Sequence, residues 1–196
     1  MTAFVAGIDE AGRGPLAGPV VAGAVILRPG SRLRGLADSK SLSAAVRLRL
    51  AASIRSEAAA HGVGWADPAE IDALDILQAT HLAMRRAVLA LALPPDRLLI
   101  DGNRAPALGG LGRAIDALCI VRGDATVAVI GAASILAKTA RDEYMERVDA
   151  LYPQYGFARH KGYPTAEHRR LLRRFGPCPL HRRSFAPVAE ALRGRA

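Results

Sequence analysis

Near its start the chain reads Gly7-Ile8-Asp9-Glu10-Ala11-Gly12-Arg13-Gly14-Pro15-Leu16-Ala17-Gly18-Pro19, and no other stretch says as much about the fold. The apolar segment Phe4–Ile8 leads into it, and a second apolar segment, Val20–Leu27, follows it. Two apolar segments joined by a turn rich in glycine and proline predict two strands that form a hairpin-like start. Two adjacent carboxylates, Asp9 and Glu10, then stand at the end of the first strand.

The residue types in this stretch suggest a particular chemistry. Carboxylates at the end of a buried strand are costly unless a partner balances their charge, and a divalent cation is a natural partner. Gly12 and Gly14 let backbone N–H groups approach a ligand, and Arg13 between them can meet a phosphate. The stretch therefore predicts a metal-dependent phosphodiester site. The competing interpretation is an ordinary hairpin with two solvated acids, and the order of strand, acids and Gly-Arg-Gly-Pro argues against it.

Size and composition set the class of protein. The 196 residues, 51% of them hydrophobic, can bury the core of one domain with a small C-terminal appendage. We expect neither a transmembrane span nor a secretory signal, because no apolar run has the required length or flanks. Cys119 and Cys178 are too few for a disulfide scaffold or a zinc site, although a disulfide between them stays open. We expect a monomer in a reducing cytoplasm.

The charge suggests the kind of partner. A net charge of +9 favours nucleic acid or another polyanion. The basic residues concentrate near the C-terminus, where the chain contains Arg169, Arg170, Arg173, Arg174, Arg182 and Arg183 beside His160, Lys161, His168 and His181. These side chains either follow the phosphates of a nucleic acid or form a solvated helix face.

Along the chain, strand patterns alternate with helix patterns. The expected order is a helix from the N-cap Ser43 to about His61, a strand at Val63–Ala66, a helix from Asp67 to Pro94-Pro95, strands at Arg97–Asp101 and Leu118–Val121, and a helix at about Ala132–Leu151. This alternation predicts an α/β fold with a mixed sheet flanked by helices over residues 1–151. Residues 152–196 read as a basic, helical C-terminal subdomain that covers one side of the same site.

Two acids later in the sequence also follow apolar strands, as Asp9 and Glu10 do. Asp101 ends an apolar strand and precedes Gly102-Asn103, and Asp124 closely follows the strand Leu118–Val121. Ligands of open α/β sheets collect at strand ends, so acids at neighbouring ends can bind one ion. Four carboxylates thus provide the oxygen ligands of a two-metal phosphoryl-transfer site: Asp9, Glu10, Asp101 and Asp124. The two adjacent acids point to opposite faces in a regular strand, so they need a bend or the strand end to converge.

Taken together, the motifs resemble bacterial ribonuclease HII over nearly the whole chain. They are Gly7–Pro15, Asp38-Ser39-Lys40, Ile100-Asp101-Gly102-Asn103, Gly123-Asp124, Ala132-Ala133-Ser134-Ile135-Leu136-Ala137-Lys138 with Arg141-Asp142, Tyr155-Gly156-Phe157 and His160-Lys161-Gly162-Tyr163. The resemblance implies a ribonuclease H-like fold and Mn²⁺- or Mg²⁺-dependent hydrolysis of RNA paired to DNA, including single ribonucleotides in duplex DNA. Gly131 and Thr139 depart mildly from the family pattern, which favours alanine and valine there.

The resemblance also implies roles for individual residues. The metal ligands and catalytic residues correspond to Asp9, Glu10, Asp101 and Asp124, and the residues that contact the ribose 2′-hydroxyl to Gly12, Arg13, Gly14 and Tyr163. A tyrosine hydroxyl is donor and acceptor at once, so it can distinguish RNA from DNA. Tyr163 is otherwise a half-buried structural tyrosine before Pro164. Lys40 and Lys138 either bind backbone phosphates or are surface residues, and Asp142 is expected to form a salt bridge with Lys138 or in the neighbourhood of Arg141.

Two other functions compete with this one. A non-catalytic basic module that binds nucleic acid would explain the charge but not the acids at strand ends. Another metal-dependent phosphodiesterase of related fold, such as a phosphohydrolase or an exonuclease, is less consistent with the intact Gly-Arg-Gly and Lys-Gly-Tyr motifs. A longer class of ribonuclease H has an extra N-terminal domain, and we expect this chain to fall outside it because the chain begins at the first motif strand.

Overall fold

One mixed sheet forms the centre of the protein. The computed structural model describes residues 3–31, 33, 36, 42–107 and 115–194. Within these residues, five strands lie in the order β3-β2-β1-β4-β5. They are β1 (Val5–Ala11), β2 (Val20–Ile26), β3 (Ala60–Ala66), β4 (Arg97–Asp101) and β5 (Asp116–Ile120). The pairs β1–β2 and β2–β3 are antiparallel, whereas β4 runs parallel to β1 and β5 parallel to β4. The predicted hairpin and mixed sheet are confirmed.

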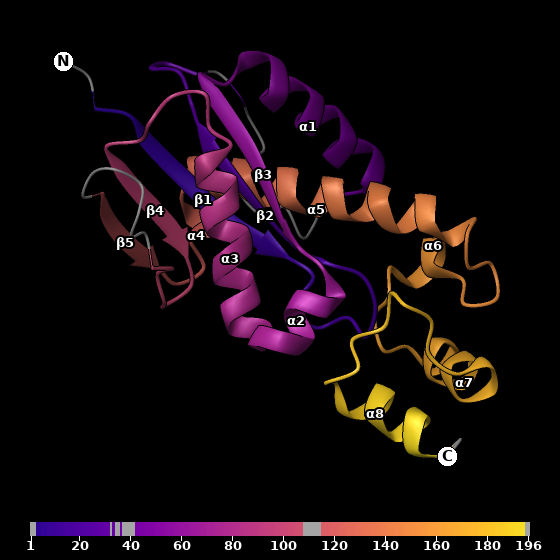
Figure 1. The fold of residues 1–196 in the computed structure, drawn as a ribbon. Helices are drawn as coiled ribbons and strands as arrows, with labels where there is room; N and C mark the ends of the chain where they lie inside the picture. Colours follow the sequence, from indigo (N-terminus) through magenta and orange to yellow (C-terminus); the bar gives the residue numbers. More distant parts are fainter. Residues whose placement is uncertain (1–2, 32, 34–35, 37–41, 108–114, 195–196) are drawn as a thin grey trace.

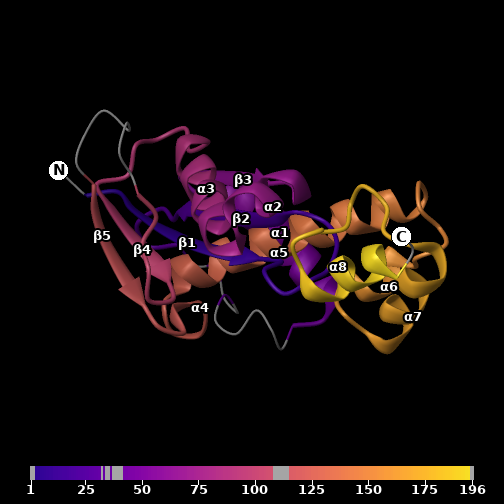
Figure 2. The same cartoon turned by 60° about the horizontal axis from the view of Figure 1, so that its bottom comes forward.

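Helices cover both faces of this sheet. In chain order, the described helices are α1 (Ala44–Glu57), α2 (Pro68–Leu74), α3 (Ile76–Leu89), α4 (Gly123–Thr126), α5 (Ala128–Asp149), α6 (Phe157–His160), α7 (Ala166–Phe175) and α8 (Ala186–Arg193). The helix α3 covers one face, and α5 with α1 beyond it covers the other (Figure 1). Figure 2 shows α6, α7 and α8 together at one end of the molecule. Among the described helices, none combines the length and apolarity that a membrane crossing requires.

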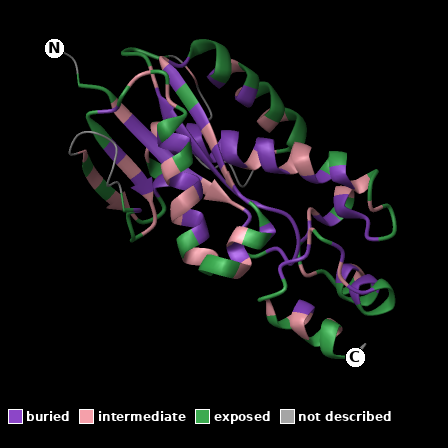
Figure 3. Cartoon of the chain, in the orientation of Figure 1, coloured by how far each residue is buried: buried purple, intermediate pink, exposed green. Residues whose placement is uncertain are grey.

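The core lies on both sides of β2. All seven residues of this strand are buried (Figure 3), which explains why its sequence is a continuous apolar run rather than an alternating one. Toward α3 the sheet packs against Ala83 and Met84, and toward α5 it packs against Ala133 and Leu136. The two cysteines both fall within the described residues and both are free thiols, so the disulfide left open by the sequence does not form.

The contact between α5 and the sheet is unusually close. A Cβ atom at Gly7 would lie 2.2 Å from the carbonyl oxygen of Val129, and one at Gly23 would lie 2.3 Å from that of Ala133. Side chains at these positions would collide with the helix backbone, so glycine in β1 and β2 lets α5 rest directly on the strands. This contact places the next turn of α5, which contains Ser134 and Lys138, beside the end of β1.

Two helix boundaries differ from the prediction. The first helix ends at Glu57 rather than near His61, because Ala58 is already extended and residues 60–62 pair with β2. The predicted helix from Asp67 to the prolines is two helices, α2 and α3. Asp75 separates them with φ 75°, and its carboxylate accepts hydrogen bonds from the first N–H groups of α3. Leu74, the last residue of α2, is exposed beside this break.

The remaining boundaries agree within a few residues. The helix that was predicted to begin at Asp67 does so, with a capping box formed by Asp67 and Glu70 and with Pro68 in its first turn. The helix α5 begins at Ala128, four residues before the predicted Ala132, because the preceding turn continues directly into it. After α5 the described chain forms short helices, and the segment that follows the Gly-Arg-Gly turn hydrogen-bonds to them. In this attachment, Leu16 N–H donates to the Gly162 carbonyl and Gly18 N–H to that of Leu180.

Candidate active site

The carboxyl ends of β1 and β4 bring the predicted acids together. Ile8 pairs with Ile100 across these parallel strands, so the next residues, Asp9 and Asp101, stand side by side. Asp9, Glu10 and Asp101 line one pocket of about 400 Å³, called the acidic pocket below. Asp124 is buried in α4, and its backbone N–H donates to Asp101 Oδ1 at 3.3 Å. Three of the predicted acids thus border the pocket directly, and the fourth contacts it through Asp101.

Asp9 and Glu10 reach this pocket from different sides of β1. Asp9 accepts a hydrogen bond from the hydroxyl of Ser134 on α5. Glu10 also lines a second cavity, of about 310 Å³, together with Thr80 and His81 of α3. The alternation of a regular strand is therefore kept, and the two acids approach each other because they stand near the strand end. The Glu10 N–H donates to Asp9 Oδ1 at 2.7 Å, which fixes that carboxylate.

Burial and neighbouring charges disfavour the ionised forms of Asp9 and Glu10. Burial, and then the charge of Glu10, raises the pKa of Asp9 well above its ordinary value, and Asp101 adds to this effect. Burial also raises the pKa of Glu10, while the guanidinium of Arg13, 3.6 Å away, opposes the rise. Crowded, desolvated carboxylates of this kind favour the binding of a cation.

The donor set fits a divalent metal ion in kind. Carboxylate oxygens are the hard ligands that Mg²⁺ and Mn²⁺ prefer, and three such groups border a cavity wide enough for an ion and its ligands. In the described part of the chain, no three Asp, Glu, His or Cys side chains already stand in a metal-binding arrangement. The acids therefore share a pocket without forming a closed ligand shell, because Asp9 and Glu10 approach it from opposite sides.

Tyr163 and the Gly-Arg-Gly turn face each other across the acidic pocket. We call residues 12–14 the recognition loop; all three residues line this pocket, and so does Tyr163. A Cβ atom at Gly14 would have the Tyr163 ring as its nearest neighbour, at 4.0 Å. Tyr163 is 40% exposed, so part of the residue is open to a ligand in the pocket. The two motifs are 150 residues apart in the sequence, and the fold brings them into one site.

Of the two lysines predicted to bind phosphates, the structure describes only Lys138. Lys138 lines the acidic pocket, 5.8 Å from the centre of the Tyr163 ring. It also pairs with Asp142 at 2.7 Å, which confirms the predicted ion pair. Lys40 lies outside the described residues, together with the rest of its motif.

Three residues that border the acids were not singled out from the sequence. They are Ser134 and Arg47 in the acidic pocket and His81 in the second cavity. Ser134 could have been found, because it is a lone hydroxyl among buried alanines of α5. The positions of Arg47 and His81 follow from how α1 and α3 pack, and no local pattern reveals that.

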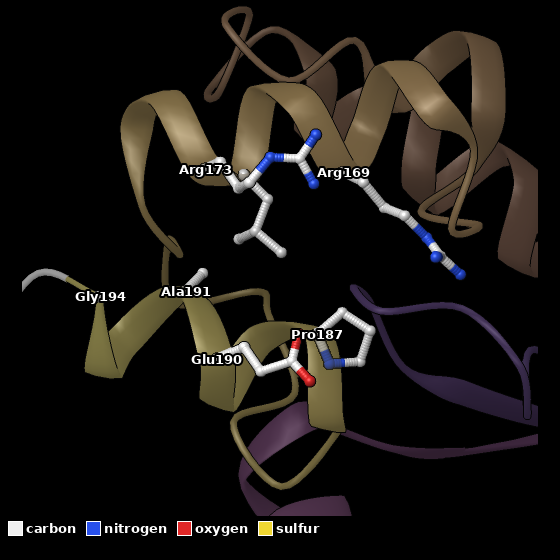
Figure 4. A pocket seen from close by; sticks show the side chains of 7 residues that line it. Arg169, Arg173, Pro187, Glu190, Ala191 and Gly194 are labelled. Atoms are coloured by element: carbon white, nitrogen blue, oxygen red, sulfur yellow. The ribbon is translucent and has the colours of Figure 1, made fainter.

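The basic residues near the C-terminus divide into two groups. Arg169 and Arg173 are exposed and line a cavity of about 350 Å³ between α7 and α8, with Glu190 on its other wall (Figure 4). By contrast, Arg182 is fully buried and donates hydrogen bonds to backbone carbonyls. The expectation that Arg182 contacts phosphates is therefore wrong, and Arg183 alone of that pair is exposed.

The C-terminal histidines are not part of the basic surface either. His160, His168 and His181 are buried beside Phe157. Burial lowers the pKa of His168 to about 4 and that of His181 to about 3, so both rings are neutral at physiological pH. The Nε2 atoms of His168 and His181 are 3.1 Å apart, and His168 Nδ1 lies 2.9 Å from the Tyr163 carbonyl.

Comparison with known proteins agrees with this geometry. A family model described as Ribonuclease HII matches residues 6–188. The chain belongs to the ribonuclease HII family. A ribonuclease HII from Laribacter hongkongensis is 60% identical over 96% of this chain and 93% of its own length. The ribonuclease HII of Bordetella pertussis is 56% identical over 96% of this chain and 91% of its own.

Solved structures share the fold. The ribonuclease H2 from Pyrococcus horikoshii OT3 superposes with a TM-score of 0.83 at 28% identity, over 97% of this chain and 98% of that one. A Bst ribonuclease HIII in complex with Mn²⁺ superposes with a TM-score of 0.75 at 22% identity, over 97% of this chain and 70% of that one. The predicted ribonuclease H-like fold is confirmed.

Membership of the ribonuclease HII family also decides between the competing functions. The chain is an endoribonuclease that cleaves RNA paired to DNA, including embedded ribonucleotides. The non-catalytic binding module and the other phosphodiesterase of related fold are thereby excluded.

Proposed function

We propose that this chain cleaves the RNA strand of RNA–DNA hybrids, and DNA duplexes at single ribonucleotides, with Asp9, Glu10, Asp101 and Asp124 as catalytic metal ligands. The observation that carries the proposal is the acidic pocket, in which carboxylates from two strands face the recognition loop and Tyr163. When bound, Mn²⁺ or Mg²⁺ supplies Lewis-acid stabilisation of the attacking and leaving oxygens.

The protein's own groups have separate tasks in this proposal. The Ser134 hydroxyl and the Glu10 N–H hold the Asp9 carboxylate in place. The backbone of the recognition loop and the hydroxyl of Tyr163 bind the ribose 2′-hydroxyl, and a deoxyribose leaves these polar groups unpaired. Lys138 and Arg47 supply positive charge for backbone phosphates at the same pocket.

We also propose that residues 1–151 are the catalytic domain and that residues 152–196 are a subdomain packed on the same site. The position of Tyr163 in the acidic pocket supports this division. The partners proposed for the chain are RNA–DNA hybrids and ribonucleotide-containing duplex DNA, bound by a monomer in the cytoplasm. Sedimentation of the purified protein tests the monomer.

The decisive assay uses labelled duplex DNA that contains one ribonucleotide. We expect cleavage in Mn²⁺ or Mg²⁺ and none after chelation. Since water rather than the 2′-hydroxyl is the nucleophile, the products should have 5′-phosphate and 3′-hydroxyl ends. An all-DNA duplex of the same sequence is the control and should stay intact. A 2′,3′-cyclic phosphate end would contradict the proposed chemistry.

The exposed arginines of α7 should contribute to binding but not to recognition. Arg169→Gln with Arg173→Gln should weaken duplex binding and lower the salt dependence of the binding constant by about one unit of slope per lost phosphate contact. The preference for ribonucleotide-containing duplex over all-DNA duplex should persist. Binding titrations at several salt concentrations measure this, and Arg49→Gln, which removes one exposed charge from α1, is the control for each single variant. An unchanged slope would assign Arg169 and Arg173 to the solvated surface.

A further inference from the structure

Two arginines are completely buried between the recognition loop and the C-terminal segment. Arg141 of α5 and Arg182, which precedes α8, are both 0% exposed. Burying a guanidinium is costly, and burial lowers the pKa of Arg182 to about 9. Buried charged groups persist in folded proteins where hydrogen-bond partners compensate them, and both arginines have such partners in the main chain.

Arg182 donates hydrogen bonds to the main chain of the recognition loop and of the residues that follow it. Its Nη2 donates to the Gly12 carbonyl at 2.5 Å and its Nη1 to the Arg13 carbonyl at 2.9 Å. Its Nε donates to the Gly18 carbonyl at 2.9 Å, and its backbone N–H to that of Leu16. One side chain therefore fixes both ends of the turn that follows the acids.

Arg141 joins the same turn to the segment that carries Tyr163. Its Nε donates to the Pro19 carbonyl at 3.1 Å, and its Nη2 donates both to the Ala17 carbonyl at 3.2 Å and to the Lys161 carbonyl at 2.9 Å. The Arg141 guanidinium also lies 5.7 Å from the centre of the Tyr163 ring. Arg141 thus contacts both sides of the gap between the recognition loop and Tyr163.

Gly12 of the recognition loop lies directly against the side chain of Arg141. Its φ is 97°, a conformation that residues with side chains rarely adopt. A Cβ atom at Gly12 would lie only 2.1 Å from Arg141 Nε. The recognition loop therefore adopts its conformation directly against the Arg141 guanidinium.

Main-chain carbonyls take the place of carboxylates as partners of these arginines. Among the described residues, neither guanidinium forms an ion pair, and Arg141 Nη1 is buried without an acceptor. An apolar side chain in either place would leave several buried carbonyls without a donor, so each guanidinium is tied to the backbone segments that it holds. A planar guanidinium with five donors can hold several carbonyls at fixed positions, which a lysine cannot do.

We propose that Arg141 and Arg182 are positioning residues for ribonucleotide recognition, because they set the gap between the recognition loop and Tyr163. This inference rests on the proposed function of the acidic pocket and extends it to two residues that do not line that pocket. They touch neither the substrate nor the acids. Their effect passes through the backbone of residues 12–19 and through the segment from Lys161 to Tyr163.

The test compares Arg182→Lys and Arg141→Lys with the wild-type enzyme. Both variants keep the positive charge but lose the forked donor geometry. We expect kcat on the single-ribonucleotide duplex to fall about 10- to 100-fold, because small errors in the position of binding groups cost this much. The dissociation constant for all-DNA duplex should change less than twofold. Circular dichroism and thermal unfolding establish the temperature at which every variant is folded, and the assays are done there.

Arg86→Lys is the matched control. Arg86 also binds a backbone carbonyl, that of Trp65, and forms a two-bond ion pair with Glu70. It lies on α3 and does not border the acidic pocket. Its replacement should lower the thermal unfolding temperature and leave kcat unchanged, which is the behaviour of an arginine with a purely structural role.

A double variant tests the coupling directly. If Arg182 positions the loop opposite Tyr163, then Tyr163→Phe should reduce kcat less in the Arg182→Lys background than in the wild type. Additive effects, or Lys variants that lose thermal stability but keep kcat, would overturn the inference. If Arg182→Lys fails to fold, the same cycle with Arg141→Lys decides. Loss of activity in Tyr163→Ala with full kcat in the Lys variants would overturn only this inference, whereas full activity of Tyr163→Ala would overturn it together with the proposed role of Tyr163.

Discussion

Asp9→Asn should abolish most of the cleavage activity and make the metal-free protein more stable. The asparagine keeps the shape of the side chain but removes a charge that a metal ligand needs, so the rate should fall by several orders of magnitude. In the absence of metal, the same change removes a buried carboxylate that faces Glu10 and Asp101, which relieves repulsion. Cleavage kinetics and thermal unfolding of the same preparation measure both effects. Asp101→Asn should reduce the rate similarly.

The pH dependence of stability follows from the raised pKa of Asp9. In the window between its unfolded and its folded pKa, the folded protein holds more protons than the unfolded chain. The contribution of Asp9 to the free energy of unfolding of the metal-free protein should therefore fall as pH rises through that window and stay lower above it. Asp9→Asn should remove most of this fall. Added Mn²⁺ should stabilise the wild type at neutral pH and the variant much less.

Asp116→Asn is the control for a lost aspartate charge. Asp116 lies at the exposed edge of the sheet and pairs with Arg97, with its side chain 63% exposed. This variant should retain wild-type cleavage and its response to Mn²⁺. Full activity of Asp101→Asn in saturating metal would remove Asp101 from the mechanism.

Tyr163→Ala should give the second largest loss of activity. The variant loses a half-exposed ring together with its hydroxyl, whereas Tyr163→Phe loses only the polar contact, worth about 0.5–1.5 kcal/mol. The alanine variant should therefore be clearly slower than the phenylalanine variant on a single-ribonucleotide duplex. Both should bind Mn²⁺ and all-DNA duplex like the wild type, because the acids and the exposed arginines are unchanged.

Tyr144→Ala is a suitable comparison for the loss of a tyrosine ring. Tyr144 packs against Trp65, with ring centroids 5.8 Å apart, and does not line the acidic pocket. It should lose stability rather than rate. If Tyr163→Ala cleaves as fast as the wild type, Tyr163 is a structural residue, and the recognition loop alone discriminates the ribose.

The sheet and the position of the acids could be predicted because both depend on local patterns. Apolar runs bounded by glycine and proline mark β1, β2 and β4, and an acid directly after such a run lies at or near the strand end: Asp101 is the last residue of β4, whereas β1 continues past Asp9 and Glu10 to Ala11. The break at Asp75 was not predictable from the pattern. The apolar stripe continues across it, and the positive φ of a non-glycine residue leaves no signal in the sequence.

Burial of charged groups was the other limit of the sequence analysis. Arg182 and Arg183 are neighbours of the same type, yet one is fully buried and the other is exposed. His168 and His181 likewise contribute no charge to the basic surface, because burial lowers the pKa of each ring. The burial of Arg182 arises from contacts between distant segments, as with its bond to Gly12, 170 residues away. The histidines are buried by contacts with one another and with Phe157, which no local pattern of the sequence reveals.

The glycine contacts between α5 and the sheet have a consequence for how this protein can evolve. The helix meets β1 and β2 backbone to backbone at Gly7 and Gly23, with no side chain between them. The distance from Asp9 to Ser134 is therefore set by main-chain atoms that every sequence shares. Substitutions elsewhere in the core can change how stable the protein is without moving its carboxylates. As long as Gly7 and Gly23 are kept, substitutions elsewhere in the core should leave the positions of the catalytic carboxylates unchanged.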